Sequence, residues 1–312
     1  MPRISVIICT HDPREDYLQR TLEALRAQTL PMDQWELLLI DNASKTPVSK
    51  GFDLSWQPQG KTSREEKLGK MHAWRKGMLE AQGDILVFVD DDNVLDSDYL
   101  DQALQVAGQF PFIGAWGASV VPVFESKPEP WMSDQLWRLS VEEVKEDVWS
   151  NLRGGFETKP LGAGMCVRRE VGIRYLEWCD TNEMSNVLDR KGKGDSITGY
   201  GDMNLAQCAI DIGLGTGKFA RLHLTHLIPS SRLTLDYFVR HAEGDAESLV
   251  MYCAIRKIPL PESRQTFLQT IKWKIYKMVS RKPWEHMKIH EAYRRGLRKG
   301  FEKLKAYRGE VS

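Results

Sequence analysis

The chain has 312 residues, of which 42% are hydrophobic and 28% are charged, and its formal net charge is zero. These values are typical of a soluble globular protein, and no apolar run approaches the roughly 20 residues that a membrane-spanning helix needs. The N-terminus shows no signal-peptide pattern, so a cytoplasmic protein is expected. Five cysteines without a C-x-x-C pair argue against both a disulfide framework and a zinc ribbon.

The zero net charge hides an uneven distribution of charge along the chain. Residues 264–308 contain 14 Lys or Arg residues against three Glu, which gives this segment a net charge of +11. The rest of the chain therefore carries −11. We expect the basic segment to behave as a separate electrostatic unit. The acidic body of the protein makes nucleic acid a poor partner.

The first half of the chain alternates between strand and helix patterns. Apolar runs at residues 4–9, 35–40 and 85–89 predict three buried strands. Helical spacing predicts a helix after the first strand and another over residues 64–82, ending before Gly83. Because a β-α-β-α-β order with short connections favours parallel strands, we expect a mainly parallel sheet with right-handed crossovers.

Polar side chains follow all three predicted strands. Because the carboxyl ends of parallel strands meet at one edge of a sheet, these side chains are expected on the rim where α/β proteins bind ligands. They are Thr10, His11, Asp12, Asp41, Asn42, Asp90, Asp91 and Asp92. Three consecutive carboxylates repel one another unless a cation compensates, and Mg²⁺ or Mn²⁺ is the natural candidate. The alternative is a solvated acidic turn.

Two common phosphate-binding patterns are missing from the sequence. No G-x-G-x-x-G follows the first strand and no G-x-x-x-x-G-K-[ST] occurs anywhere, so a bound nucleotide would be held by acids and a metal. After about residue 112, short apolar runs and the Pro-rich segment 127–131 predict antiparallel strands and loops. Gly154 with Gly155, and Gly192 with Gly194, predict two mobile loops.

From about residue 262 onward the chain is helical by period, with a break at Pro283. The apolar residues form two stripes, Phe267, Ile271, Ile275 and Met278, and then Ile289, Tyr293, Leu297, Phe301 and Leu304. One interpretation is that both stripes pack on the rest of the chain or on a second copy of it. The other is that the basic helices of residues 264–308 attach the protein peripherally to an anionic membrane surface at the inner face of the membrane.

Three sequence blocks resemble, in order and spacing, the family 2 glycosyltransferases of the GT-A fold. They are residues 7–12, 39–44 and 83–92, and the shared pattern covers roughly residues 4–125. Further similarity at 161–169, 201–205, His226 and Arg232 extends the resemblance to about residue 245.

This resemblance implies an α/β fold with a Rossmann-like, mainly parallel central sheet, helices on both faces and a small antiparallel sheet. It implies a catalytic domain at 1–245, with a nucleotide-binding half at about 1–110 and an acceptor half at about 111–245. A basic, mostly helical extension at 246–312 follows.

The resemblance also implies an inverting enzyme that uses a nucleotide-sugar donor, a Mn²⁺ or Mg²⁺ ion and a glycan or lipid-linked acceptor. A UDP-sugar is favoured, with GDP- and dTDP-sugars as alternatives. Asp92 and His226 would hold the metal, while Asp90 would bind the ribose. Donor contacts are expected from Thr10, His11, Asp12, Asp41, Asn42, Lys70, Asp90, Asp91 and Gly164. Thr10 and Asp41 would meet the base, and Lys70 either contacts phosphate or lies on a solvated helix face.

Inverting transfer needs a base that takes the proton of the acceptor hydroxyl, and a carboxylate suits this task. Asp202, at the predicted start of a helix, is the candidate base, and an ordinary N-cap is the alternative for the same residue. Two departures from the family pattern leave the substrate open: Gly201 stands where a Glu is common, and residues 73–77 read Ala-Trp-Arg-Lys-Gly.

Two other functions compete with glycosyl transfer. A sugar nucleotidyltransferase would also use acids for a metal, but it would need a loop rich in glycine and basic residues after the first strand, which is missing. A nucleotide-sugar-binding module that has lost catalysis is the non-enzymatic alternative, and Gly201 motivates it.

Overall fold

The computed structural model describes residues 2–182, 188, 199–262 and 283–309. In chain order the elements, with η for a 3-10 helix, are β1 (Ile4–Thr10), α1 (Glu15–Arg26), η1 (Met32–Gln34), β2 (Trp35–Asn42), η2 (Val48–Lys50), β3 (Gly60–Glu65), α2 (Lys70–Glu80), β4 (Ile85–Val89), β5 (Asn93–Leu95), α3 (Tyr99–Gln109), β6 (Ile113–Phe124), η3 (Pro130–Leu139), β7 (Val148–Ser150), β8 (Cys166–Arg168), α4 (Arg169–Thr181), α5 (Gly201–Asp211), β9 (Gly215–Ile228), η5 (Ser230–Arg232), α6 (Leu235–Arg256) and α8 (Trp284–Tyr307). The predicted loop at residues 192–194 and the first apolar stripe of the C-terminal segment lie outside the described residues.

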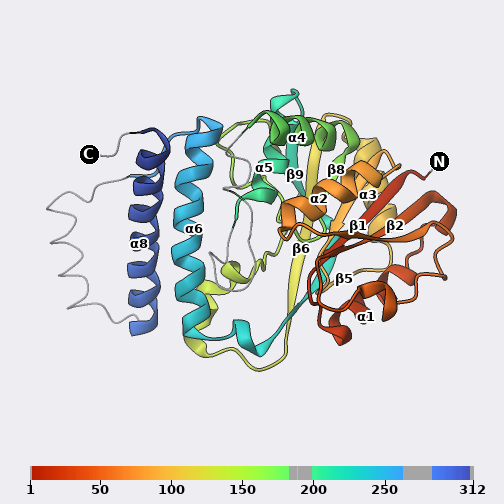
Figure 1. The fold of residues 1–312 in the computed structure, drawn as a ribbon, viewed down its shortest axis with the longest axis horizontal. Coiled ribbons are helices and arrows are strands. Elements are labelled where there is room, and N and C mark those ends of the chain that lie inside the picture. The colour runs from red at the N-terminus through yellow and green to blue at the C-terminus, as the bar shows by residue number, and fades with distance from the viewer. Residues whose placement is uncertain (1, 183–187, 189–198, 263–282, 310–312) are drawn as a thin grey trace, which may run out of the picture.

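The strands form one sheet in the order β3-β2-β1-β4-β8-β6-β9-β5, and β7 pairs with β9 (Figure 1). The first four strands in this order pair in parallel, which confirms the expected β-α-β-α-β core. Strand β8 is antiparallel to both β4 and β6, while β5 and β7 are antiparallel to β9. The predicted mixed α/β architecture with a mainly parallel sheet is therefore confirmed.

Helices cover both faces of the sheet because successive strand residues point to opposite sides. On one face, Ile8 and Leu39 pack with apolar side chains of α1 and α3. On the other, Ile7 and Leu38 pack with α2, α4 and α5. The strands read as continuous apolar runs for this reason, as expected of a parallel sheet that is buried on both sides.

The predicted helix over residues 64–82 is wrong at its N-terminal end. Residues up to Glu65 belong to β3, and the helix α2 begins at Lys70. The polar segment of β3 becomes a strand because it pairs with the edge of β2, where Arg64 lies opposite Asp41. Gly83 does not cap the helix: a Cβ there would lie 2.5 Å from the backbone of Ile4, so close approach of two backbones explains the glycine.

The second half of the sheet differs from the predicted antiparallel arrangement. The two longest strands of the described chain, β6 and β9, pair in parallel along most of their length, with irregular register near Gly117 and Ser119. The prediction of antiparallel strands after about residue 112 is right only for β7 and β8. Parallel pairing is possible because α4 and α5 provide the long crossover between β6 and β9.

The helices α6 and α8 run side by side in the same direction beside the sheet domain, and α8 lies on the outer side of α6 (Figure 1). The second predicted stripe faces inward: Ile289 and Leu304 are buried, and Tyr293 is half-buried against the cluster that includes Phe238. The predicted boundary at residue 245 falls inside α6, which continues unbroken to Arg256. None of the helices in the described residues is long and apolar enough to cross a membrane.

Candidate active site

The carboxyl ends of β1, β2 and β4 meet at one edge of the sheet. Thr10 pairs with Asp41 across β1 and β2, and Ile8 pairs with Val89 at the end of β4. At this edge the Thr10 hydroxyl donates a hydrogen bond to Oδ2 of Asp91. The acidic triplet therefore lies directly beside the end of the central strand.

Lys70 reaches the triplet from the first turn of α2. Its Nζ lies 2.6 Å from Oδ1 of Asp90. The preceding Gly69 has a φ of 144°, which side-chain-bearing residues rarely adopt, and its N–H donates to Oδ1 of Asn42 at 2.9 Å. Asn42 also donates to the carbonyl of Lys67 at 2.8 Å. Asn42 thus holds the turn that brings Lys70 to the rim.

Asp92 is buried and contacts two residues from the end of β9 and from η5. Its Oδ2 lies 3.4 Å from Nε2 of His226 and 3.1 Å from Nη2 of Arg232. Nη1 of Arg232 also lies 3.1 Å from Nε2 of His226. The guanidinium of Arg232 therefore bridges Asp92 and His226, the two side chains that were predicted to bind a metal.

The neighbouring carboxylates Asp91 and Asp92 differ in their affinity for protons. Burial raises the pKa of Asp91, and the negative charge of Asp92 raises it further. Burial acts in the same direction on Asp92, but His226 and Arg232 outweigh it and hold the pKa of Asp92 well below its usual range. Asp92 is therefore an anion, whereas Asp91 holds its proton more tightly than an ordinary aspartate does.

Asp41 is almost completely buried and already has several hydrogen-bond partners. Its Oδ1 accepts from the N–H of Ser44 at 2.9 Å, and its Oδ2 accepts from the N–H of Val48 at 3.3 Å and from Nη1 of Arg64 at 2.7 Å. Burial alone would raise the pKa of Asp41, but the hydrogen bonds from Ser44 and Arg64 outweigh it and lower that pKa. Asp41 holds the loop after β2, and Arg64 covers the carboxylate on the side of β3.

His11 and Asp12 connect the loops that follow β1 and β2. Nδ1 of His11 lies 2.8 Å from the carbonyl oxygen of Asn42. Asp12 has a φ of 46°, its N–H donates to the Ser44 hydroxyl at 3.0 Å, and its Oδ1 accepts from the N–H of Lys45 at 2.8 Å. Both side chains also border a small cavity of about 140 Å³ next to Asp91 and Asp92. They define the shape of the rim beside the acidic triplet.

Asp202 lies in the first turn of α5, whose N-cap position is held by Tyr200. The N-cap interpretation of Asp202 is therefore wrong, although its Oδ1 does accept from the N–H of Met203 at 2.8 Å. Burial raises the pKa of Asp202, and the positive charge of Lys70 opposes this shift while Asp90 adds to it. The candidate base thus lies within electrostatic range of the acidic rim.

Gly164 and Gly162 differ in what their backbones approach. Gly164 has a φ of +68°, and a Cβ there would lie 2.5 Å from Leu224 and 2.6 Å from the Tyr99 hydroxyl, which are both core side chains. A Cβ at Gly162 would lie 3.3 Å from the carboxyl group of Asp202. Gly164 therefore serves packing, whereas Gly162 lies against the candidate base.

Three residues of this site were not among the predicted site residues: Arg64, Gly162 and Arg232. Arg64 becomes relevant only through its contact with Asp41 across a long sequence separation. Gly162 belongs to the segment 161–169 that resembles the family, but its approach to Asp202 follows from the fold. Arg232 carried a signal in the sequence, because it belongs to the segment that resembles the family after His226. Its bridging position between His226 and Asp92 follows from the fold alone.

The surroundings of Asp92 suit a divalent cation. A carboxylate oxygen and an imidazole nitrogen already meet there around the cationic group of Arg232. Within the described ranges no group of three or more His, Cys, Asp or Glu side chains is arranged to hold a metal ion. One or two protein ligands are nevertheless common for Mg²⁺-type ions, which take their other ligands from substrate phosphates and water.

Comparison with known proteins gives consistent results. The family model described as Glycosyl transferase family 2 matches residues 5–164. Glycosyltransferase AglE of Haloferax volcanii is 24% identical over 181 residues, which cover 53% of this chain and 59% of that protein. A putative glycosyltransferase EpsH of Bacillus subtilis is 28% identical over 109 residues, which cover 34% of this chain and 31% of that protein. The matched regions thus span less than two thirds of these relatives.

Two solved structures share the fold. A mannosyltransferase from Pyrobaculum calidifontis in complex with GDP-Man and Mn²⁺ superimposes with a TM-score of 0.54 at 19% identity, covering 93% of this chain and 74% of that one. Staphylococcus aureus TarS 1–349 in complex with UDP gives a TM-score of 0.52 at 15% identity, covering 100% of this chain and 92% of that one. With the GT-A arrangement of the sheet and a family model that matches half of its residues, the chain belongs to glycosyl transferase family 2.

Proposed function

We propose that the protein is an inverting, metal-dependent glycosyltransferase that transfers a sugar from a nucleotide diphosphate sugar to a hydroxyl group of a glycan or lipid-linked acceptor. The observation that carries the proposal is the association of Asp202 with the acidic rim through Lys70. Lys70 forms an ion pair with Asp90 at 2.6 Å, and the charges of both residues act on the pKa of Asp202. A donor-binding rim and a carboxylate base thus belong to one electrostatic unit.

The metal-binding part of the proposal rests on Asp92 and His226. These residues would hold Mn²⁺ or Mg²⁺ once Arg232 gives up its bridging position. A bound divalent ion neutralises negative charge on the leaving diphosphate. Arg232 then remains available as a second positive group beside the same phosphates.

The transfer itself is assigned to Asp202. The acceptor oxygen attacks the anomeric carbon of the donor sugar while the bond from that carbon to the diphosphate oxygen breaks. Asp202 takes the proton of the acceptor hydroxyl, and attack from the face opposite the leaving group inverts the configuration. A pKa above that of an ordinary carboxyl makes Asp202 a better proton acceptor, and Gly162 leaves room beside it.

Recognition of the nucleotide is assigned to the loops after β1 and β2. A uracil N–H could approach Asp41 if Arg64 released Oδ2, the oxygen that it now occupies at 2.7 Å. A UDP-sugar therefore remains the favoured donor, with GDP- and dTDP-sugars as alternatives. The Thr10 hydroxyl is the second expected contact, and it now donates to Asp91.

The experiment is a donor panel assayed by release of nucleoside diphosphate in the presence of Mn²⁺ or Mg²⁺. We expect one class of nucleotide sugar to be turned over, and we expect chelation with EDTA to stop the reaction. The variant Asp202→Asn should bind the same donor but fail to transfer its sugar. Absence of turnover with every donor, together with no change of melting temperature on adding any nucleotide, would contradict the proposal.

The attraction of the basic C-terminal segment to an anionic membrane also remains a proposal. The apolar stripe of α8 packs on α6 and is therefore not free to enter a bilayer. Exposed basic side chains remain on its outer surface at Lys288, Arg298 and Lys305. They support electrostatic contact with lipid head groups rather than insertion.

A further inference from the structure

A cavity of about 650 Å³ lies between η3, α6 and α8, away from the acidic rim. Its volume falls in the range of roughly 300–1,000 Å³ that is usual for small-molecule sites. Aromatic side chains of Phe156, Tyr200 and Tyr293 line it together with Arg138 and Asp245. The helix α8 forms one wall, so residues far outside the matched family region complete the cavity.

Arg138 is the polar group in this cavity whose hydrogen bonds are least complete. Its side chain is only 8% exposed, and its Nε donates to Gln135 at 3.1 Å. Nη1 lies 3.8 Å from Oδ2 of Asp245, which is beyond hydrogen-bond distance, and has no hydrogen-bond partner in the described chain. Arg138 lines the cavity, and a ligand oxygen that accepts from its guanidinium would add a hydrogen bond to a buried cation whose hydrogen bonds are incomplete.

The chemistry of the cavity favours an uncharged ligand that has hydroxyl groups. Asp245 balances the charge of Arg138, and the Tyr200 hydroxyl donates to Oδ1 of Asp245 at 3.1 Å. An anionic ligand would be attracted by Arg138 but repelled by Asp245. A hydroxyl group can accept from the guanidinium of Arg138 and donate to the carboxylate of Asp245 at once, while the aromatic walls cover apolar C–H surface.

The cavity is a neighbour of the candidate base. Tyr200 immediately precedes α5, whose first turn contains Asp202. Burial raises the pKa of Asp245, and the charge of Asp202 adds to that shift, so the two carboxylates interact electrostatically. A molecule held at Arg138 and Asp245 is therefore close to the place where the acceptor hydroxyl must lose its proton.

We propose that this cavity binds an uncharged sugar unit of the acceptor, with α8 as the wall that selects it. The proposal rests on the glycosyl transfer proposed above and adds the acceptor class. A sugar ring offers both an apolar face for Tyr293 and Phe156 and paired hydroxyl groups for Arg138 and Asp245. Acceptor choice then depends on η3, α6 and α8, whereas donor choice depends on the rim.

The test measures binding without requiring turnover. Saturation-transfer-difference NMR would compare p-nitrophenyl glycosides of neutral sugars with the p-nitrophenyl glucuronide, using the full chain. We expect at least one neutral glycoside to bind and the glucuronide to bind more weakly. The variant Asp245→Asn should weaken binding of the neutral glycoside about tenfold, because a hydrogen bond to a charged group is lost.

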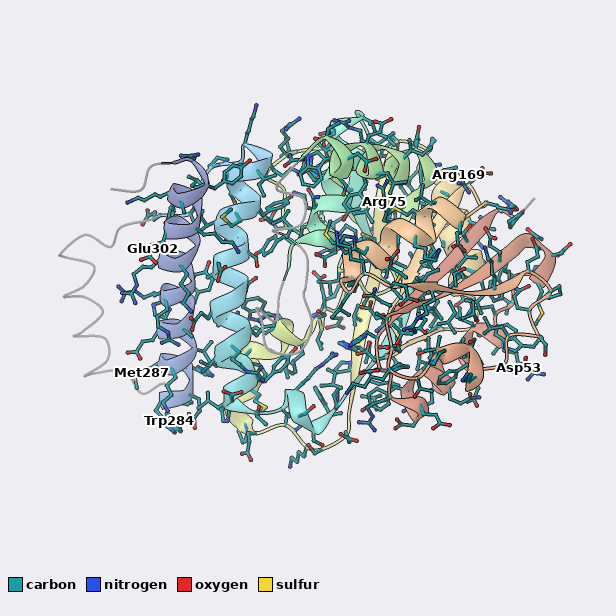
Figure 2. The ribbon with its side chains drawn as sticks, viewed as in Figure 1. Asp53, Arg75, Arg169, Trp284, Met287 and Glu302 are labelled. Atoms are coloured by element: carbon teal, nitrogen blue, oxygen red, sulfur yellow. The ribbon has the colours of Figure 1, made fainter. Side chains whose placement is uncertain are left out.

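A pair of matched variants controls for folding. His290 lines the cavity from an exposed position on α8, so His290→Trp fills the cavity without disturbing the core. Glu302 is exposed near the other end of the same helix (Figure 2), and Glu302→Trp is the control. We expect only His290→Trp to weaken glycoside binding, by about tenfold or more, at unchanged melting temperature.

The outcomes separate this inference from the proposed function. Equal binding of glycosides to wild type and His290→Trp, or preferential binding of the glucuronide, would overturn the inference. Glycoside binding that depends on His290 and Asp245, in a protein that turns over no nucleotide sugar, would support a sugar site while contradicting glycosyl transfer. If transfer occurs, His290→Trp should raise the KM for the acceptor and leave the KM for the donor unchanged.

Discussion

Asp202 occupies surroundings that are unfavourable to its own charge. Burial raises its pKa, and the N–H groups of Met203 and Gly162 offset this only in part. When the pKa of a carboxyl group is higher in the folded state than in the unfolded state, its protonated form adds to the stability of the fold. This contribution is complete at pH values below the pKa of the unfolded state. That contribution is lost as the pH rises through the raised folded pKa. At neutral pH the ionised Asp202 therefore lowers the stability of the fold, and its proposed role as the base would account for this.

The first prediction concerns the variant Asp202→Asn. Transfer should fall by about 10²- to 10⁴-fold, which is the usual contribution of a general base. Its melting temperature at neutral pH should rise above that of the wild type, because the buried charge is gone, and the difference should shrink at acidic pH. Wild-type kcat/KM should increase with pH through the raised pKa of Asp202. Unchanged turnover or a lowered melting temperature would contradict this role.

The second prediction concerns Arg232, whose guanidinium lies 3.1 Å from Asp92 and so occupies the place expected for a cation. Removing this positive charge in Arg232→Gln should strengthen Mn²⁺ binding to the nucleotide-free protein, on the order of tenfold. Electron paramagnetic resonance of free Mn²⁺ measures this directly. Arg221→Gln, which removes an arginine paired with Asp147 elsewhere on β9, is the control. Weaker Mn²⁺ binding in Arg232→Gln would show that Arg232 supports the site instead.

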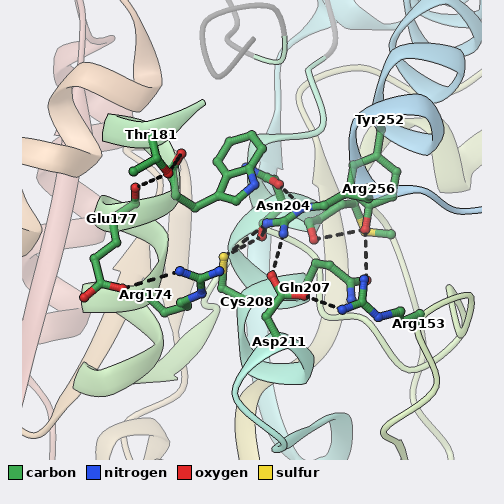
Figure 3. Close-up of polar contacts among 12 residues, drawn as sticks. Arg153, Arg174, Glu177, Thr181, Asn204, Gln207, Cys208, Asp211, Tyr252 and Arg256 are labelled. Atoms are coloured by element: carbon green, nitrogen blue, oxygen red, sulfur yellow. Dashed lines mark hydrogen bonds and ion pairs between the residues drawn. The ribbon is translucent and has the colours of Figure 1, made fainter. Parts of the chain in front are cut away.

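At the scale of elements, a buried arginine connects α6 to α5 (Figure 3). Arg256 donates to Oδ1 of Asn204 at 2.5 Å and to Oδ2 of Asp211 at 2.6 Å. Its guanidinium also lies 4.5 Å from the ring centre of Trp178 on α4. The helix that carries Asp202 is thus anchored at its far end to the helix that lines the cavity.

The third prediction follows from this network. Arg256→Met should lower the free energy of unfolding by about 3–5 kcal/mol, because it leaves Asp211 buried without its main partner. Arg153 also reaches Asp211, at 3.4 Å, but its side chain is 59% exposed. Arg153→Met should therefore lower the free energy of unfolding by less than about 1 kcal/mol. Urea denaturation of the two variants gives the comparison, and equal losses would contradict the assignment of Arg256 as the anchor.

The fourth prediction concerns the contact between α6 and α8. A Cβ at Gly296 would lie 2.0 Å from the carbonyl oxygen of Glu243 and 2.9 Å from Cβ of Ala246. Gly296→Ala should therefore destabilise the protein by about 1–3 kcal/mol, although alanine is the better helix former. A Cβ at Gly108 in α3 would meet no atom within 4 Å, so Gly108→Ala should instead stabilise by about 0.5–1 kcal/mol. Thermal unfolding should show a lower melting temperature for Gly296→Ala and a higher one for Gly108→Ala than for the wild type.

At the scale of the whole molecule, the C-terminal positive charge is partly balanced by α6. Arg295 and Lys299 form ion pairs with Glu243, and Lys303 forms one with Glu247. These contacts add to the apolar packing that joins α8 to α6. Part of the basic segment thus forms ion pairs within the molecule, and the proposed contact with a membrane concerns only its outer surface.

The fifth prediction tests that outer surface. Co-sedimentation of the protein with vesicles should increase with their content of anionic lipid and decrease with added salt. Replacing Lys288, Arg298 and Lys305 together by Gln should weaken the binding to vesicles by about 1 kcal/mol per residue. Replacement of the exposed Lys45, Lys127 and Lys145 by Gln is the matched control. Binding that is independent of anionic lipid, or equal loss in both triple variants, would contradict the prediction.

Much of the N-terminal half of the fold could be predicted from the sequence, because its signals are local. The three apolar runs became β1, β2 and β4, and their order required the polar residues after them to share an edge. The polar strand β3 was missed because its residues have no strand pattern, and only its pairing with β2 makes it a strand. Gly83 was misread as a helix end because the backbone that it approaches is distant in sequence.

The sequence by itself determined the family, the α/β class and the acidic rim, because parallel strands must end together and bring their terminal residues to one edge. Only the tertiary structure decided which side chains face one another there. It set Arg232 between Asp92 and His226, and it formed the cavity from η3, α6 and α8. Such contacts depend on packing between segments far apart in the chain, which neither periodicity nor spacing encodes.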